Sequence, residues 1–277
     1  MTTNASPTTQ LKSVFLKNPF AVLPAPTELT YPNGRVTPEL LMHYKAFAQT
    51  EAALVITGPA TVAPPNSRKY SLLRADQPKY LDGLRALTKI ISSNGSLPGI
   101  HITHTGECDA QSLMQGHFDY RDNLDWINGD KLVTAFRNAS QRACEVGFRY
   151  VELGACYFLV LQQIVKEDME DLIREIFDAS IRAVDENHLI GLRLHPECPQ
   201  HDKYARLFIE MGGDIVAYQN LGIPELDQVP AVPHRAHSMT NLGGPALPDK
   251  VLELLKHSCL IGVSQSLHNK KQAPHFD

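Results

Sequence analysis

Three polar side chains that could bind an anion or move a proton lie at or just beyond the ends of short apolar runs: His101, Tyr157 and Arg193. A guanidinium keeps its positive charge when it is removed from water, so Arg193 could stabilise negative charge in a buried site. An imidazole titrates near neutral pH, so His101 could act as an acid or a base. The phenol of Tyr157 could donate a proton beside a carbonyl group. These three residues are the predicted catalytic set.

Each of these residues also has a purely structural interpretation. Arg193 could form a buried ion pair with Glu152, which is expected on the neighbouring strand and facing the same side. Such an ion pair is compatible with a second role in binding. His101 could be a hydrogen-bonded structural histidine, and Tyr157 could simply pack its ring. Cys156 is expected to be inert if it is buried, because only a thiolate is reactive.

A metal site is the alternative use of the histidines. His101, His104, His195, Cys198 and His237 lie near three predicted strand ends, and His195-x-x-Cys198 has a spacing that would allow chelation. Zinc sites usually show tighter patterns than this one, so no metal is predicted. Strand side chains alternate, so His104 is expected to face away from His101 and to be structural.

Eight short runs rich in β-branched residues alternate with longer amphipathic stretches, a pattern typical of βαβ units and a parallel sheet. The predicted strands cover residues 20–23, 53–57, 99–103, 150–153, 190–194, 215–218, 236–240 and 260–263. The predicted helices cover residues 38–50, 78–94, 129–146, 166–187, 203–211 and 248–257. Pro38 and Pro248 fall in the first turn of their helices, where proline is tolerated best.

This order of elements predicts a single (β/α)8 barrel over residues 1–277, with residues 1–12 as a flexible tail. An open doubly wound sheet is less favoured, because no Gly-x-Gly-x-x-Gly follows any predicted strand. The proline-rich segment 223–233 contains no helical pattern, so one βα unit is expected to be degenerate. In a barrel of this kind, the chemistry lies at the carboxyl ends of the strands.

The composition indicates a single globular domain. Hydrophobic residues make up 43% and charged residues 20% of the 277 residues, and the net charge is −4. This balance supports one large core and argues against nucleic acid as a partner. The five cysteines form no C-x-x-C pair and no apolar run is long enough to span a membrane, so a reduced, cytoplasmic protein is expected. Association into a homo-oligomer is compatible with the sequence, which shows no interface pattern.

Taken in chain order, several segments resemble the Old Yellow Enzyme family of FMN-dependent ene reductases. No single motif is specific, but the collinear order is, and it extends from Leu16 to about Leu267. The segments that carry the resemblance are Leu16-Lys17-Asn18, Val22-Leu23-Pro24-Ala25-Pro26-Thr27, Gly34 with Thr37, His43 and Tyr44, Leu54-Val55-Ile56-Thr57-Gly58, Ile100–Gly106, Gly147–Leu153, Ile190–Leu194 and Leu260–Val263.

The departures from the family pattern all fall on the catalytic face. Gly154 and Tyr157 stand where the family carries a pair that holds the substrate oxyanion, and Leu159 replaces its proton-donating tyrosine. His101 replaces the glutamine at the flavin edge, and Ser264-Gln265 replaces the phosphate-binding Gly-Arg. The long loop after the fourth strand is missing.

The resemblance implies an FMN-dependent oxidoreductase that uses NAD(P)H and acts on a small conjugated carbonyl compound. FMN binding is expected to be weak or lost, given these departures. The residues implied in cofactor binding are Pro24, Ala25, Pro26, Gly58, His101, Arg193, Gly243, Gly244, Ser264 and Gln265. The alternative is a barrel that has lost flavin and catalyses an isomerisation or cyclisation, or only binds a ligand or partner.

Overall fold

The computed structural model describes residues 9–18, 20–24, 27, 29–50, 52–64, 72–105, 128–156, 160–195, 198–218, 235–240 and 260–264. For residues 9, 235–240 and 260–264 it describes the backbone alone. The strands are β1 (Thr9–Leu11), β2 (Val14–Leu16), β3 (Phe20–Val22), β4 (Leu54–Thr61), β5 (Leu73–Arg74), β6 (Leu97–Thr103), β7 (Tyr150–Ala155), β8 (Leu189–Leu194), β9 (Ile215–Tyr218), β10 (Arg235–Thr240) and β11 (Leu260–Ser264). The helices are α1 (Pro38–Ala48), the short 3-10 helix η1 (Pro78–Tyr80), α2 (Leu81–Ser93), α5 (Gly129–Glu145), α6 (Val160–Lys166), α7 (Glu170–Arg182) and α8 (His201–Glu210).

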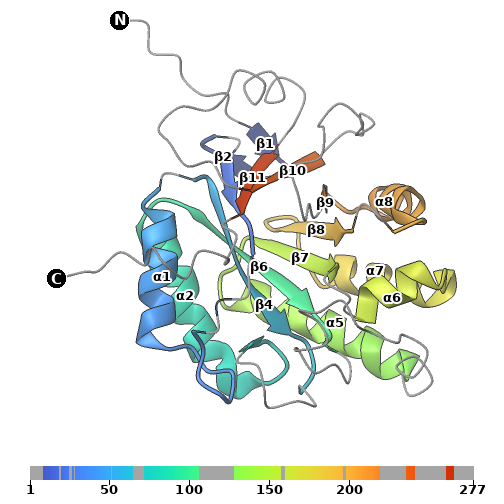
Figure 1. Cartoon of the computed structure of the whole chain (residues 1–277), viewed down its shortest axis with the longest axis horizontal. Helices are drawn as coiled ribbons and strands as arrows, with labels where there is room; N and C mark the ends of the chain where they lie inside the picture. Colours follow the sequence, from blue (N-terminus) through green and yellow to red (C-terminus); the bar gives the residue numbers. More distant parts are fainter. Residues whose placement is uncertain are drawn as a thin grey trace, which may run out of the picture.

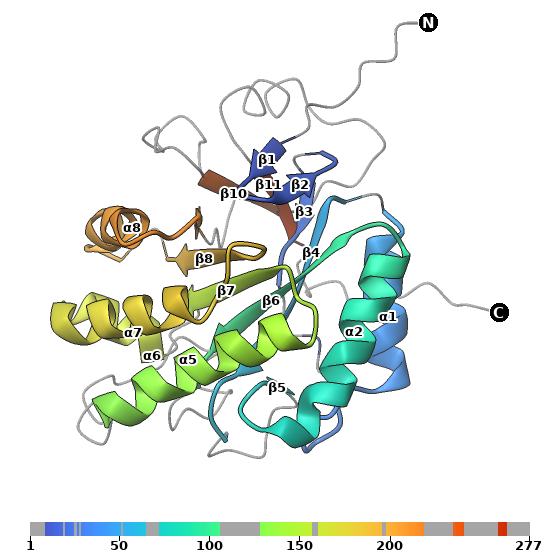
Figure 2. The ribbon, with the colours of Figure 1, turned by 180° about the vertical axis from the view of Figure 1, so that it is seen from behind.

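Eight parallel strands close on themselves. They are hydrogen-bonded in the order β3-β11-β10-β9-β8-β7-β6-β4, and β3 also pairs with β4, which joins the two ends of this row. The short strand β5 pairs in parallel with the last two residues of β4, Ala60 and Thr61. Helices surround this ring, with α1 and α2 on one side and α5, α7 and α8 around the other (Figures 1 and 2). The predicted (β/α)8 barrel is therefore confirmed.

Alternation along the strands separates two apolar regions. Residues on one face, such as Val151, Leu153 and Ile190, are buried under the helices. Residues on the other face, such as Leu54, Tyr150 and Leu189, are buried inside the ring. Because strand side chains alternate in direction, even-numbered residues of β7 and odd-numbered residues of β6 and β8 point inward.

The β1–β2 hairpin covers the amino ends of the strands. Leu11, Val14 and Leu16 pack against the inner residues at the starts of β4, β7 and β8. Lys12, at the hairpin turn, forms an ion pair of 2.8 Å with Asp214, just before β9. The expectation of a flexible tail over residues 1–12 is thus wrong for residues 9–12, while residues 1–8 lie outside the described part. Because the hairpin covers the amino ends of the strands, the polar side chains inside the ring lie toward the carboxyl ends of the strands.

The boundaries of two predicted helices are corrected. The predicted helix 166–187 is shortened to α7, Glu170–Arg182, and α6, which ends at Lys166, was not predicted; Asp168 lies between the two helices at a positive φ of 56°. The first turn of helix 78–94 is the 3-10 helix η1. Pro38 opens α1, where Thr37 accepts a hydrogen bond from the Leu40 amide, as the proline position predicts. The segments 223–233 and 248–257 lie outside the described residues.

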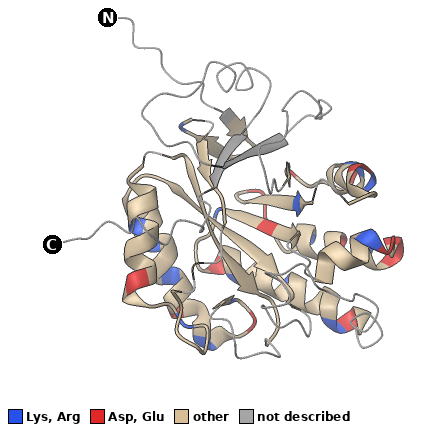
Figure 3. Cartoon of the chain, viewed as in Figure 1, with Lys and Arg blue, Asp and Glu red and all other residues tan. Residues whose placement is uncertain are grey.

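Among the described residues, most Lys, Arg, Asp and Glu positions lie on the outer helices (Figure 3). Within the described residues, no helix is both long and apolar enough to cross a membrane.

Candidate functional site

A charged cluster lies inside the otherwise apolar ring. His101 of β6 and Glu152 of β7 are 0% exposed, and Arg193 of β8 is 2% exposed. The three strands are neighbours, and their register pairs His101 with Glu152 and Gly154 with Arg193. Burying charged groups is unfavourable unless they are paired and hydrogen-bonded, so the contacts within this cluster are essential to it.

Glu152 is the centre of the cluster because it accepts hydrogen bonds on both carboxylate oxygens. Oε2 accepts from Arg193 Nε at 2.7 Å and lies 2.7 Å from His101 Nδ1. Oε1 accepts from Arg193 Nη2 at 2.9 Å and from the Tyr150 hydroxyl at 2.9 Å. A carboxylate offers about four lone-pair directions, so these contacts saturate it. Glu152 therefore holds its neighbours in place and is not itself available to a ligand.

The cluster fixes the charges of its members. Burial by itself would raise the pKa of Glu152, but the charge of Arg193 and the hydrogen bonds from His101 and Arg193 lower that pKa below its usual value. Burial on its own would lower the pKa of the Arg193 guanidinium. The Glu152 carboxylate outweighs this effect and raises that pKa above its usual value. The Glu152–Arg193 pair is thus ionised with a net charge of zero.

Tyr150 is the member of this cluster that the sequence analysis did not single out as functional. Its ring needs the space left by glycines on both neighbouring strands. A Cβ atom on Gly191 would lie 2.0 Å from the Tyr150 hydroxyl oxygen, and one on Gly99 would lie 3.1 Å from its ring. The signal was present as a tyrosine two residues before Glu152 on the same face, with a glycine on each flanking strand.

Gly154 has the same relation to His101. A Cβ atom on Gly154 would lie 2.3 Å from His101 Nε2 and 2.7 Å from Cε1, so the imidazole lies directly over this glycine. Gly154 stands where the family pattern has a histidine. In this chain the space at that position is filled by the imidazole of β6.

The structure places four of the predicted site residues completely. His101 and Arg193 are brought together, and the predicted ion pair between Arg193 and Glu152 is confirmed. Gly58 packs closely against the backbone of His101, since a Cβ atom on Gly58 would lie 2.7 Å from the His101 carbonyl oxygen. Pro24 is buried just after β3.

The remaining predicted residues are not placed completely. Ser264 ends β11, where its backbone pairs with Thr240 of β10. Tyr157, Ala25, Pro26, Gly243, Gly244 and Gln265 lie outside the described residues. Their roles stay predictions.

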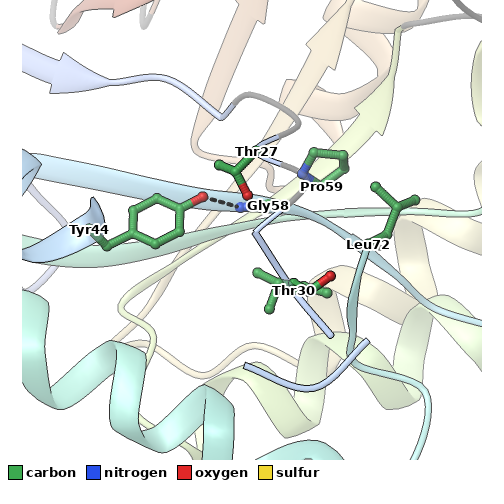
Figure 4. Close-up of a pocket in the computed structure, with 7 residues that line it drawn as sticks. Thr27, Thr30, Tyr44, Gly58, Pro59 and Leu72 are labelled. Carbon is green, nitrogen blue, oxygen red and sulfur yellow. Dashed lines mark hydrogen bonds between the residues drawn. The ribbon is translucent and has the colours of Figure 1, made fainter. Parts of the chain in front are cut away.

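A small pocket lies beside Gly58 (Figure 4). It is lined by Thr27, Thr30, Tyr44, Gly58, Pro59, Leu72 and Leu73. The Gly58 amide donates a hydrogen bond of 3.0 Å to the Tyr44 hydroxyl, so α1 is tied to β4 at this point. Tyr44, at the middle of α1, is buried, and its hydroxyl takes up the amide of Gly58, a residue predicted to bind the cofactor.

Other candidate groups show no feature of a reactive site. The Cys156 thiol is buried and burial raises its pKa, as expected for an inert thiol. Burial lowers the pKa of His104 to about 4, so this histidine is neutral at physiological pH. Within the described part of the chain, no three histidine, cysteine or carboxylate side chains are grouped to hold a metal ion.

The carboxyl-end groups fit the ring of a flavin. Thr103 lies two residues beyond His101 on the same face of β6, and its hydroxyl is buried with no hydrogen-bond partner among the described residues. Arg193 uses Nε and Nη2 toward Glu152, so its Nη1 donors stand outside the ion pair. A hydroxyl and a guanidinium are suited to polar atoms on a ring edge.

The fold is that of Old Yellow Enzyme. The structure matches the Old Yellow Enzyme of Pichia sp. with a TM-score of 0.71 at 17% identity, covering 94% of this chain and 83% of that chain. It matches morphinone reductase in complex with tetrahydroNAD with a TM-score of 0.73 at 15% identity, covering 94% and 86% of the two chains. No protein-family model matches the sequence.

Similar curated proteins agree with this fold. An NADPH dehydrogenase of Geobacillus sp. is 20% identical over 239 residues, covering 74% of this chain and 68% of that protein. A probable NADH-dependent flavin oxidoreductase of Bacillus subtilis is 25% identical over 224 residues, covering 70% and 60%. An NADPH dehydrogenase of Bacillus pumilus is 27% identical over 163 residues, covering 54% and 48%.

The chain thus spans between about half and two thirds of the length of these relatives. The predicted resemblance to the Old Yellow Enzyme family is confirmed, and the low identities make this chain a divergent relative.

Proposed function

We propose that this protein is an FMN-dependent oxidoreductase that takes electrons from NAD(P)H and acts on a small conjugated carbonyl compound in the cytoplasm. Dehydrogenases and flavin oxidoreductases among its relatives support the class of reaction. The observation that carries the proposal is a guanidinium, Arg193, held rigidly by Glu152 toward the carboxyl end of the barrel. In a (β/α)8 enzyme, this end is where the chemistry takes place.

Bound FMN would supply the hydride chemistry, and the protein's share is binding and electrostatics. Arg193 would hold the ring edge, because its Nη1 donors are left outside the ion pair. Glu152 fixes the plane of the guanidinium through two parallel hydrogen bonds, so little side-chain entropy is lost when a ligand binds. The Thr103 hydroxyl would add a donor on the same inner face.

Single-turnover kinetics test this proposal. Protein reconstituted with FMN is mixed without oxygen with NADPH or NADH, and bleaching of the visible flavin band is followed. We expect the wild type to bleach, and Arg193→Ala to bind FMN more weakly or to bleach more slowly. Lys203→Ala serves as the control, because Lys203 forms a half-exposed ion pair with Asp168 on the outside of the barrel. Identical behaviour of Arg193→Ala and wild type would remove Arg193 from the site.

A second function, a non-redox reaction in a barrel without flavin, is favoured by one observation. Glu152 neutralises the charge of Arg193, which reduces the attraction of this guanidinium for a negatively charged ring. An isomerisation would need only an acid and a base near a polarised carbonyl group, and His101 could serve in such a reaction. A protein that takes up no FMN but retains His101 and Arg193 in this arrangement would support this second function.

A further inference from the structure

Arg193 is the member of the buried charged cluster that a ligand can contact. Its side chain is 3% exposed, whereas the side chains of His101 and Glu152 are 0% exposed. Nε and Nη2 of Arg193 donate to Glu152, and Nη1 is not among the nitrogens and oxygens of the described residues that lack both a partner and contact with solvent. A ligand at the carboxyl end of the barrel therefore meets Nη1, and the Glu152 carboxylate lies behind it.

Glu152 cancels the charge that this guanidinium presents to a ligand. Hydrogen bonds of 2.7 Å and 2.9 Å hold the two groups together, and the charge of Arg193 keeps Glu152 ionised by lowering its pKa. Tyr150 and Cys156, also on the inner face of β7, are neutral because burial raises the pKa of both. A cluster that would attract an anion through Arg193 alone is thus close to neutral where the Glu152–Arg193 pair lies.

The distance between Glu152 and such a ligand is short enough for this cancellation to matter. A ligand atom that accepts a hydrogen bond from Nη1 lies within about 8 Å of the carboxylate, because only the guanidinium separates the two. At the effective dielectric constant of a protein, a charge at this distance changes the binding of a second charge by more than about tenfold. The carboxylate therefore weakens the binding of a negative ligand by this order.

Transfer of a hydride from NAD(P)H is the step that this cancellation would affect. A hydride carries two electrons and one proton, so the nicotinamide is left with one more positive charge and the flavin side of the site gains one negative charge. An unpaired guanidinium would stabilise this negative charge. Because Glu152 pairs the guanidinium, most of that stabilisation would be lost.

We propose that Glu152 is a positioning residue that lowers the reduction potential of bound FMN by neutralising the guanidinium of Arg193. This inference rests on the proposed function and adds to it how the site is tuned. A lower potential makes the reduced cofactor a stronger hydride donor. The site would therefore favour passing the hydride on to an acceptor over retaining it on the cofactor.

The test measures the two-electron reduction potential of bound FMN without oxygen, at one pH, in equilibrium with a dye of known potential. Its shift from free FMN gives the ratio of the affinities for reduced and oxidised FMN, and a tenfold change in this ratio is about 30 mV. We expect Glu152→Gln, which removes the charge and keeps the size, to raise the potential by at least about 30 mV. Glu170→Gln is the matched control and should cause no shift, because Glu170 also pairs with an arginine, Arg174, but on the exposed surface of α7.

The same comparison is made in a His101→Gln background. His101 Nδ1 also contacts the Glu152 carboxylate, at 2.7 Å, so a change in the charge of the imidazole would compensate for the loss of the carboxylate charge. With glutamine at position 101 no such compensation is possible. A potential that Glu152→Gln leaves equal or lowers in this background would overturn the proposal.

The wild type decides the question if Glu152→Gln does not fold, since removing one partner of a buried ion pair is strongly destabilising. We expect the potential of FMN bound to the wild type to lie no more than about 30 mV above that of free FMN. A higher value, which means that reduced FMN is bound over tenfold more tightly than oxidised FMN, would overturn the inference and leave the proposed function intact. A wild type that binds no FMN would refute the proposed function and this inference with it.

Discussion

Replacing Tyr150 by phenylalanine removes a single hydroxyl from the buried charged cluster. Tyr150 is 2% exposed, and its hydroxyl donates a hydrogen bond of 2.9 Å to Oε1 of the fully buried Glu152. A hydrogen bond to a charged group contributes about 1.5–3 kcal/mol to stability. Because water has no access to replace this bond, we expect Tyr150→Phe to lower the free energy of unfolding by about 1.5–3 kcal/mol.

Urea unfolding measures this change. If the slope of the unfolding free energy against urea concentration is the same in the variant and the wild type, the two undergo the same transition and differ only in stability. Tyr204→Phe is the matched control. Its hydroxyl also donates to a carboxylate, that of Asp168, but this carboxylate is 47% exposed, so we expect a loss below about 1 kcal/mol. Equal losses in the two variants, or a loss below about 0.5 kcal/mol for Tyr150→Phe, would refute the reasoning that burial makes the Tyr150–Glu152 contact strong.

Three further changes test other parts of the account. Gly154→Ala places a methyl group 2.3 Å from His101 Nε2, so it should displace the ring and destabilise the protein by about 1–3 kcal/mol in urea unfolding. Arg193→Lys cannot keep both hydrogen bonds to Glu152, so we expect its FMN dissociation constant, measured by fluorescence titration, to rise about tenfold. The pKa of His104 is lowered by burial from 6.5 to about 4, so the unfolded chain binds a proton that the folded chain does not within this window, and stability should fall as the pH falls. His104→Asn should lose much of this pH dependence, which for a shift of this size is roughly 3 kcal/mol, and an unchanged profile would contradict the assignment.

The eight barrel strands were predictable because most of them are short apolar runs separated by longer amphipathic stretches. Strand β9 begins and ends where the sequence predicts, and the others differ by a few residues at their ends. The β1–β2 hairpin was not predicted, because strands of three residues are too short to show an alternating pattern. Lys12 and Ser13 separate Leu11 from Val14, and the exposed residue between Val14 and Leu16 is the apolar Phe15, so apolar and polar residues do not alternate along the hairpin.

The candidate site was predictable only in part. Arg193 and Glu152 could be paired from strand order and parity alone, because both are charged residues in buried runs. Tyr150 was not assigned, because a tyrosine at the start of a buried strand is also typical of ordinary core packing, although the glycines on the two flanking strands marked its position. The contact of 2.7 Å between His101 Nδ1 and Glu152 Oε2 could not be predicted, because no sequence pattern specifies a distance of that kind.

The most direct test of the central claim is the visible absorption spectrum of the purified protein, recorded after incubation with FMN and separation of free FMN by gel filtration. We expect a flavin band that elutes with the wild-type protein and is weaker in Arg193→Lys. A wild-type protein that is folded but elutes without this band would contradict the proposed FMN-dependent oxidoreductase.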